Sequence, residues 1–163
     1  MPLSSETSLI LAAQVINTCL EQGKTISCAE SCTGGLIASA LTSVPGSSGV
    51  IKGGVVSYFI EAKEKVLGVP SDVIETYGVV SEEVAQAMAQ QARKLFDTDF
   101  AVSTTGIAGP GGAEPGKPVG TVCIGIAGPN ITATTTIHAT GEREEVRNAA
   151  VEKIFSLLLT EYL

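Results

Sequence analysis

The chain has 163 residues, of which 44% are hydrophobic, and its formal net charge is −7 with ten Lys and Arg residues. This length is enough for one ordinary hydrophobic core and short for two, so we expect a single domain spanning residues 1–163. The acidic balance argues against binding to nucleic acid or to a membrane surface, because sequence-independent binding to either requires clustered basic groups.

No apolar run approaches the length of a membrane span, and Met1–Glu6 lacks the basic and then apolar order of a signal peptide. We therefore expect a cytoplasmic protein. The four cysteines form no pair of C-x-x-C clusters, and the chain has only one histidine, His138. These counts predict reduced thiols and no metal site.

Apolar spacing predicts an alternation of helices and strands along the chain. Helices are expected at about 9–22, 33–43, 71–77, 81–96 and 142–162, with a short helical turn at 61–67, and strands at about 25–29, 55–59, 100–103, 119–127 and 131–139. Residues 49–54 are expected to form a loop. Early alternation followed by a late hairpin predicts an α/β fold, in which a mixed sheet lies between helices in a three-layer α/β/α domain.

The stretch Ala29–Gly35 gathers a hydroxyl, capping groups and two glycines at one strand-to-helix turn. A helix start presents unpaired N–H groups and the positive end of the helix dipole, which favour negative charge. Ser31 is therefore a candidate nucleophile. Two alternatives stay open: Ser31 or Thr33 simply caps the helix, or the Cys32 thiol is itself the nucleophile through a lowered pKa.

A serine nucleophile needs a base, and His138 has no Asp beside it in the sequence. A Ser-Lys pair is the better option, because a buried Lys loses its proton near neutral pH. Lys63 follows the predicted strand that carries Tyr58, whose phenol would relay a proton or steady the amine. Alternatively, Lys63 is one member of a solvated helical face, together with the charged residues at 61, 64 and 65.

Thr104–Gly112 is a glycine-rich stretch that follows a predicted strand, and such a long loop is costly to order. It either shapes a site or forms a structural turn, since it matches no phosphate-binding glycine frame. Arg143 and Arg147 lie four residues apart near the start of the last helix. They are either surface charges or partners for a phosphate.

Several motifs occur in a fixed order: Ala29–Gly35, then Gly53–Tyr58 with Lys63, Gly106–Pro110, Pro118–Val122, and Gly141–Arg143 with Val146 and Arg147. Together they resemble the CinA C-terminal domain family over nearly the whole chain. That family includes stand-alone nicotinamide mononucleotide deamidases and two-domain competence/damage-inducible proteins, and the chain resembles the stand-alone form.

The resemblance implies a serine amidohydrolase, without metal or other cofactor, that converts nicotinamide mononucleotide and water to nicotinate mononucleotide and ammonia. By resemblance, Ser31 attacks the carboxamide carbon, and Lys63 with Tyr58 accepts and returns the proton. Backbone N–H groups around Thr33 and Gly34 hold the oxyanion. Two further pairs complete the implied site: Thr105 and Gly106 contact the nucleotide, and Arg143 and Arg147 offset the phosphate charge.

One departure from the family pattern lies beside the implied base. The family commonly has Ser or Thr and then Asn between the tyrosine and the lysine, where this chain has Phe59 and Ile60. These apolar side chains either bury Lys63 further or remove a hydrogen bond that orients it. The second hypothesis is therefore a non-catalytic module that binds a nucleotide or a partner. An Ala- and Leu-rich final helix is consistent with a homodimer.

Overall fold

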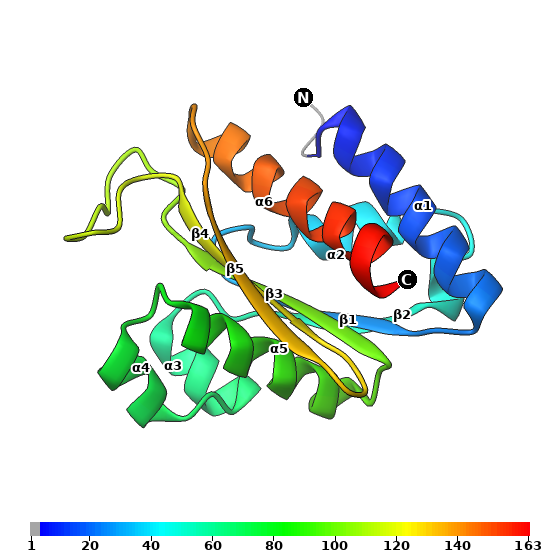
Figure 1. Cartoon of the computed structure of the whole chain (residues 1–163), viewed down its shortest axis with the longest axis horizontal. Coiled ribbons are helices and arrows are strands. Elements are labelled where there is room, and N and C mark those ends of the chain that lie inside the picture. The colour runs from blue at the N-terminus through cyan, green and yellow to red at the C-terminus, as the bar shows by residue number, and fades with distance from the viewer. Residues whose placement is uncertain (1–3) are drawn as a thin grey trace.

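In a computed structural model that describes residues 4–163, five strands form one mixed sheet between two layers of helices (Figure 1). The strand order is β2-β1-β3-β4-β5. β1 (Ile26–Glu30) pairs in parallel with β2 (Ile51–Val56) and β3 (Phe100–Gly106). β4 (Thr121–Ala127) pairs antiparallel with β3 and with β5 (Thr132–His138). The predicted mixed α/β sheet with its late hairpin is thus confirmed.

The helices form one layer on each side of the sheet (Figure 1). One layer holds α1 (Glu6–Gln22), α2 (Leu36–Thr42) and α6 (Arg143–Leu157); the other holds α3 (Ile60–Ala62), α4 (Ser71–Tyr77) and α5 (Glu82–Phe96). Turns of π-helix continue α3 over Lys63–Leu67 and α6 over Leu158–Tyr162, and a 3-10 turn spans Ser47–Gly49. Within residues 4–163, no helix combines the length and apolar character needed to cross a membrane. The prediction that no signal peptide is present rests on Met1–Glu6, and the first three of these residues lie outside the described residues.

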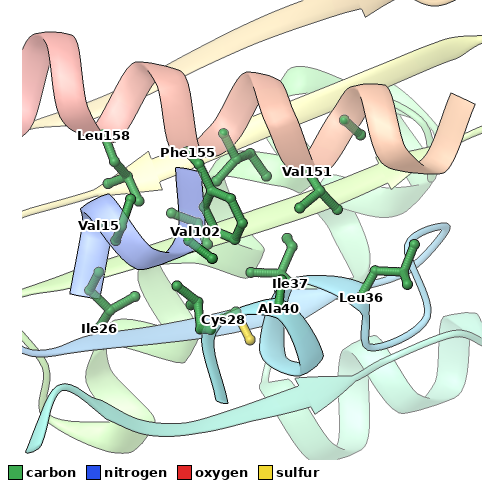
Figure 2. Packing of buried hydrophobic residues seen from close by; sticks show 14 of the residues in the cluster. Val15, Ile26, Cys28, Leu36, Ile37, Ala40, Val102, Val151, Phe155 and Leu158 are labelled. Atoms are coloured by element: carbon green, nitrogen blue, oxygen red, sulfur yellow. The ribbon is translucent and has the colours of Figure 1, made fainter. Parts of the chain in front are cut away.

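The main core lies between the sheet and the layer of α1, α2 and α6. In β1, Ile26 and Cys28 point into this core, where Phe155 and Leu158 of the last helical segment also pack (Figure 2). Successive strand residues face opposite sides, so Ser27 faces the other layer and its hydroxyl donates to the carbonyl of Ala92 in α5 at 3.3 Å. The same alternation turns the side chain of Glu30, the last residue of β1, toward α2.

The edge strand β2 differs from its prediction, because residues 51–54 belong to the strand and the strand ends at Val56. The sequence predicts Gly53 and Gly54 to lie in a loop, whereas in the structure they lie in β2 and allow close packing. A Cβ atom on Gly54 would lie 2.5 Å from the Cys28 sulfur, and one on Gly53 would collide with the Phe96 ring. Glycine in this strand therefore reflects close approach of neighbouring side chains.

β3 and α2 also differ from their predicted bounds. β3 continues to Gly106, which pairs with Val122, so Thr104 and Thr105 belong to the sheet and the glycine-rich loop begins later. α2 begins at Leu36 instead of residue 33, because residues 31–34 form a separate turn in which the Gly34 N–H donates to the Ser31 carbonyl at 3.0 Å. The longer β3 places Thr105 and Gly106 in the sheet, whereas the later start of α2 leaves Thr33 and Gly34 in a turn.

Candidate active site

Ser31 and Lys63 converge just beyond the carboxyl ends of two parallel strands. Glu30 is in register with Val56, so the segments that follow β1 and β2 emerge side by side. The Ser57 N–H donates to the Glu30 carbonyl at 2.9 Å and extends this pairing by one step. Lys63 then opens the π-helical turn that continues α3, and single π-turns of this kind occur often at functional sites.

The Lys63 side chain is buried and ends beside the Ser31 hydroxyl. Its Nζ lies 2.9 Å from Ser31 Oγ, 2.6 Å from the Ser57 carbonyl oxygen and 3.5 Å from the Tyr58 carbonyl oxygen. Only 1% of Lys63 is exposed, so the alternative of a solvated helical face is wrong. Burial lowers the pKa of the Lys63 amine from 10.5 to about 8, since removing water disfavours the charged form.

Glu30 occupies the start of α2, a role that the sequence analysis did not assign. Its carboxylate accepts hydrogen bonds from the N–H groups of Gly35, Ile37 and Ala38 at 3.1, 3.1 and 2.9 Å, and from the Thr33 hydroxyl at 2.6 Å. Neither Ser31 nor Thr33 caps the helix; Gly35 holds the N-cap position with φ 101°. A buried carboxylate of the chain therefore already satisfies the helix start that we expected to attract an anion.

The predicted oxyanion donors, Thr33 and Gly34, do not line the pocket that contains Ser31. Thr33 is fully buried, and the Gly34 N–H is already bonded to the Ser31 carbonyl. Cys32, the residue that follows Ser31 directly, does line the pocket. The structure therefore places Thr33 and Gly34 outside this pocket, because the Thr33 hydroxyl bonds Glu30 and the Gly34 N–H closes the turn.

Six of the predicted site residues line one pocket of about 370 Å³: Ser31, Tyr58, Lys63, Thr105, Gly106 and Arg143. Its remaining wall is largely apolar or glycine, with Phe59, Ile60, Val79, Val80, Ile107, Ala108, Gly109, Gly111 and Gly112, plus Cys32 and Glu114. Thr105 lines the pocket from the edge of the sheet, but its hydroxyl donates to the Val79 carbonyl at 2.8 Å. Its contribution to the wall is thus mainly its backbone and methyl group.

The backbone carbonyl of Tyr58 accepts a hydrogen bond from Lys63, whereas its phenol contacts Arg143. The Tyr58 hydroxyl accepts a hydrogen bond from Arg143 Nη2 at 2.9 Å, and Arg143 Nη1 donates to the Gly109 carbonyl at 2.8 Å. The expected phenol-to-amine contact is therefore absent, because Tyr58 follows the end of β2 and its ring is more than half exposed. Arg143 instead links Tyr58 to the glycine-rich loop across the pocket.

Arg147 lies outside the pocket, although it is only one helical turn beyond Arg143. Its Nε donates to the Cys32 carbonyl at 3.1 Å and its Nη2 to the Thr33 carbonyl at 2.9 Å. The resemblance implies a phosphate contact for Arg143 first and for Arg147 second. The structure separates them, since Arg143 lines the pocket that contains Ser31 and Arg147 bonds the carbonyls of the turn that carries Ser31.

The alternatives to a Ser-Lys pair are not favoured by this geometry. Burial raises the pKa of the Cys32 thiol to about 12, opposite to the lowering that a thiolate nucleophile needs. His138 does not line the pocket, and its Nδ1 lies 3.4 Å from the Thr121 hydroxyl. Among residues 4–163, no three His, Cys, Asp or Glu side chains form a cluster that would hold a metal ion.

The sequence profile of the CinA C-terminal domain matches residues 9–162. The chain belongs to this family. A CinA-like protein of Fervidobacterium nodosum is 48% identical over 134 residues, which cover 82% of this chain and 33% of that protein. A CinA-like protein of Chlorobaculum tepidum is 53% identical over 121 residues, covering 74% of this chain and 29% of that protein. The chain thus spans about a third of the length of these curated relatives.

Solved structures of the CinA superfamily match the whole fold. The crystal structure of a competence/damage inducible protein from Agrobacterium tumefaciens has a TM-score of 0.92 at 39% identity, with 98% of each chain covered. A CinA superfamily protein from Escherichia coli has a TM-score of 0.90 at 33% identity, covering 95% of this chain and 91% of the other. The family and the three-layer fold implied by the sequence motifs are therefore confirmed.

Proposed function

We propose that the chain is a metal-independent serine amidohydrolase whose substrate is nicotinamide mononucleotide. The observation that carries this proposal is the 2.9 Å separation between Lys63 Nζ and Ser31 Oγ, with the lysine almost fully buried. A serine hydroxyl is a weak nucleophile unless an adjacent base takes its proton. A lysine with a pKa of about 8 is neutral in part near neutral pH and can accept that proton.

The hydrogen bonds of Lys63 suit this exchange. A neutral amine has two hydrogens and one lone pair, and the carbonyl oxygens of Ser57 and Tyr58 provide two acceptors for those hydrogens. The lone pair is then left for the Ser31 hydroxyl hydrogen. In the proposed reaction, Ser31 Oγ bonds to the carboxamide carbon as its proton moves to Lys63 Nζ, and the C–N bond breaks as Lys63 returns that proton to the leaving ammonia.

Water completes the cycle by attacking the acyl-Ser31 ester, with Lys63 again accepting a proton and then restoring the serine hydroxyl. The products are a carboxylate and ammonia. The Cys32 N–H is the backbone donor that we assign to the developing oxyanion, because it belongs to the residue that follows the nucleophile directly and lines the pocket.

The pocket provides features that suit an aromatic amide bearing an anionic group. Phe59 and Ile60 give an apolar wall beside Lys63 against which a pyridinium ring can pack, and an aromatic face also attracts a cation. Arg143 at the same pocket carries a positive charge, and among the described residues its guanidinium bonds only the neutral oxygens of Gly109 and Tyr58. A phosphate would exchange those neutral acceptors for a charged one.

The direct test is release of ammonia from nicotinamide mononucleotide by the purified chain. We expect turnover by the wild type, loss of turnover in Ser31→Ala, and retention in Cys32→Ala, which removes the neighbouring thiol but keeps the backbone N–H. No ammonia at high enzyme concentration refutes the amidase, and full activity of Ser31→Ala refutes the assigned nucleophile.

A second candidate function is a non-catalytic module that binds a nucleotide or a partner through the same pocket. It is favoured by the apolar mouth, where Phe59 is 72% and Ile60 44% exposed beside the lysine. Calorimetric titration with nicotinamide mononucleotide and with dinucleotides separates the two. Tight binding without ammonia release supports the module, whereas turnover supports the enzyme.

A further inference from the structure

We propose that Arg147 is a positioning residue, which holds the turn that carries Ser31 in its reactive geometry and does not bind the substrate phosphate. This inference rests on the proposed function, because it concerns the same nucleophile. It differs from the family resemblance, which placed Arg147 beside Arg143 as a partner for the phosphate.

The contacts of Arg147 all lie on the backbone of the turn. Its guanidinium donates to the Cys32 carbonyl at 3.1 Å and to the Thr33 carbonyl at 2.9 Å. Two nitrogens of one planar group therefore form hydrogen bonds with consecutive peptides. A rigid fork of donors restrains both peptides together, which a single ammonium group does less well. Arg147 reaches the turn from α6, more than 110 residues further along the chain.

Other hydrogen bonds hold the rest of the same turn. The Ser31 N–H donates to the Thr104 carbonyl at 3.1 Å in β3, and the Gly34 N–H donates to the Ser31 carbonyl at 3.0 Å. With the Cys32 and Thr33 carbonyls fixed by Arg147, all three carbonyls of residues 31–33 are bonded. The Cys32 N–H shares its planar peptide with the Ser31 carbonyl, which the Gly34 N–H holds. Arg147 acts on that N–H indirectly, by restraining the two peptides that follow it in the same turn. That N–H is the assigned oxyanion donor.

Charge gives Arg147 a second effect on the same step. The Glu30 carboxylate lies beneath the turn, bonded to Thr33 and to the start of α2, and its negative charge opposes an oxyanion formed at Ser31. Arg147 brings a positive charge to the carbonyls of the same turn, and this charge offsets that of Glu30. Loss of Arg147 would therefore loosen the turn and make the site more negative at once.

Two substrates separate a positioning role from phosphate binding. Nicotinamide riboside carries the same carboxamide as nicotinamide mononucleotide but no phosphate. We expect Arg147→Ala to lower kcat on both substrates, on the order of 10²-fold for a misplaced reacting group, with KM nearly unchanged. Arg143→Ala should instead raise KM for the mononucleotide alone. A rise in KM for the mononucleotide but not for the riboside in Arg147→Ala would overturn the proposal.

Three further measurements separate positioning from mere stability. Guanidinium added at non-denaturing concentration should restore part of the kcat of Arg147→Ala, whereas methylammonium, which lacks the fork, should restore less. The pH at which activity falls should rise relative to the wild type, because removing a positive charge from the turn favours the protonated form of Lys63. As a matched control, Arg93→Ala removes a guanidinium that bonds the Asp99 carbonyl and should leave kcat unchanged. A kcat loss that follows only a lowered Tm, without rescue, would overturn the proposal.

A sulfonyl fluoride provides a readout that does not require amidase activity. In that reaction Ser31 Oγ bonds to sulfur, fluoride leaves and Lys63 accepts the proton, while the sulfonyl oxygens need the same N–H donor. Mass spectrometry should show slower labelling of Ser31 in Arg147→Ala than in Arg93→Ala, even if the wild type releases no ammonia and the substrate assignment is wrong. Equal labelling rates, or no labelling of Ser31 in the wild type, would overturn the positioning role.

Discussion

Replacing Lys63 with methionine should abolish turnover and yet stabilise the fold at neutral pH. Methionine has a similar length and no charge, so it fills the buried space with little change of volume. The difference between the ordinary lysine pKa of 10.5 and the pKa of about 8 for Lys63 measures how strongly the folded chain disfavours the charged amine. It corresponds to about 3 kcal/mol, since a tenfold change in an equilibrium constant is about 1.4 kcal/mol.

Methionine also removes the hydrogen bonds that Lys63 makes with the Ser57 carbonyl and the Ser31 hydroxyl. Each is worth about 1 kcal/mol, so the expected net stabilisation by Lys63→Met at pH 7 is about 1 kcal/mol. The sign changes with pH. Between pH 8 and 10.5 the unfolded wild type holds a proton that the folded wild type has lost, so wild-type stability rises with pH across this window.

The assay is urea unfolding of the wild type and Lys63→Met at pH 7 and pH 10, with ammonia release measured in parallel. Relative to the variant, the wild type should gain about 2 to 3 kcal/mol between these two pH values. Wild-type turnover should fall tenfold for each pH unit below about 8, as the neutral amine becomes scarce. A stability difference that stays constant from pH 7 to pH 10 would refute the reasoning, because Lys63 would then titrate alike in both states.

Three other changes test the surroundings of the site. Glu30→Gln should lower the free energy of unfolding by about 2–4 kcal/mol, because a neutral amide cannot accept all the hydrogen bonds that the N–H and hydroxyl groups now donate to the carboxylate. An unchanged thermal midpoint would contradict this. Iodoacetamide at pH 7.5 should label Cys32 slowly and leave turnover intact, since its thiol pKa is about 12; rapid inactivation traced to Cys32 by mass spectrometry would contradict it. Gly125→Ala should lower the free energy of unfolding by about 1–3 kcal/mol in chemical denaturation, because the added Cβ collides with the Ala85 carbonyl of α5. A free energy of unfolding equal to that of the wild type would contradict this and would show that α5 can shift.

The order of the elements was largely predictable because each signal is local. Helical spacing, strand composition and the hairpin around residues 128–131 depend on neighbours in the sequence, and the structure has all of these elements. Lys63 could be named as a candidate base because it follows the strand that carries Tyr58, whereas its contact with Ser31 depends on the parallel pairing of β1 with β2, which only the structure shows.

The roles of Glu30 and Arg147 were not predictable by the same means. Glu30 belongs to the motif around Ser31, but its burial depends on how β1 and α2 pack, and the one local hint was a carboxylate at the end of an apolar strand. Arg143 and Arg147 have the same chemistry and the same helical face in the sequence. Their neighbours differ because Arg143 reaches Tyr58 and Gly109, whereas Arg147, one turn later, reaches the carbonyls after Ser31.

The proposed base depends on the outermost strand of the sheet. β2 has a strand neighbour on one side only, and its residues alternate between partly buried and exposed. Strand edges of this kind open locally at less free energy than the central strands. Detachment of β2 would carry Lys63 away from Ser31 while the core around β1, β3 and α6 stayed folded. Mild denaturant should thus inactivate the protein before its secondary structure is lost, with amide exchange first becoming fast along residues 51–56.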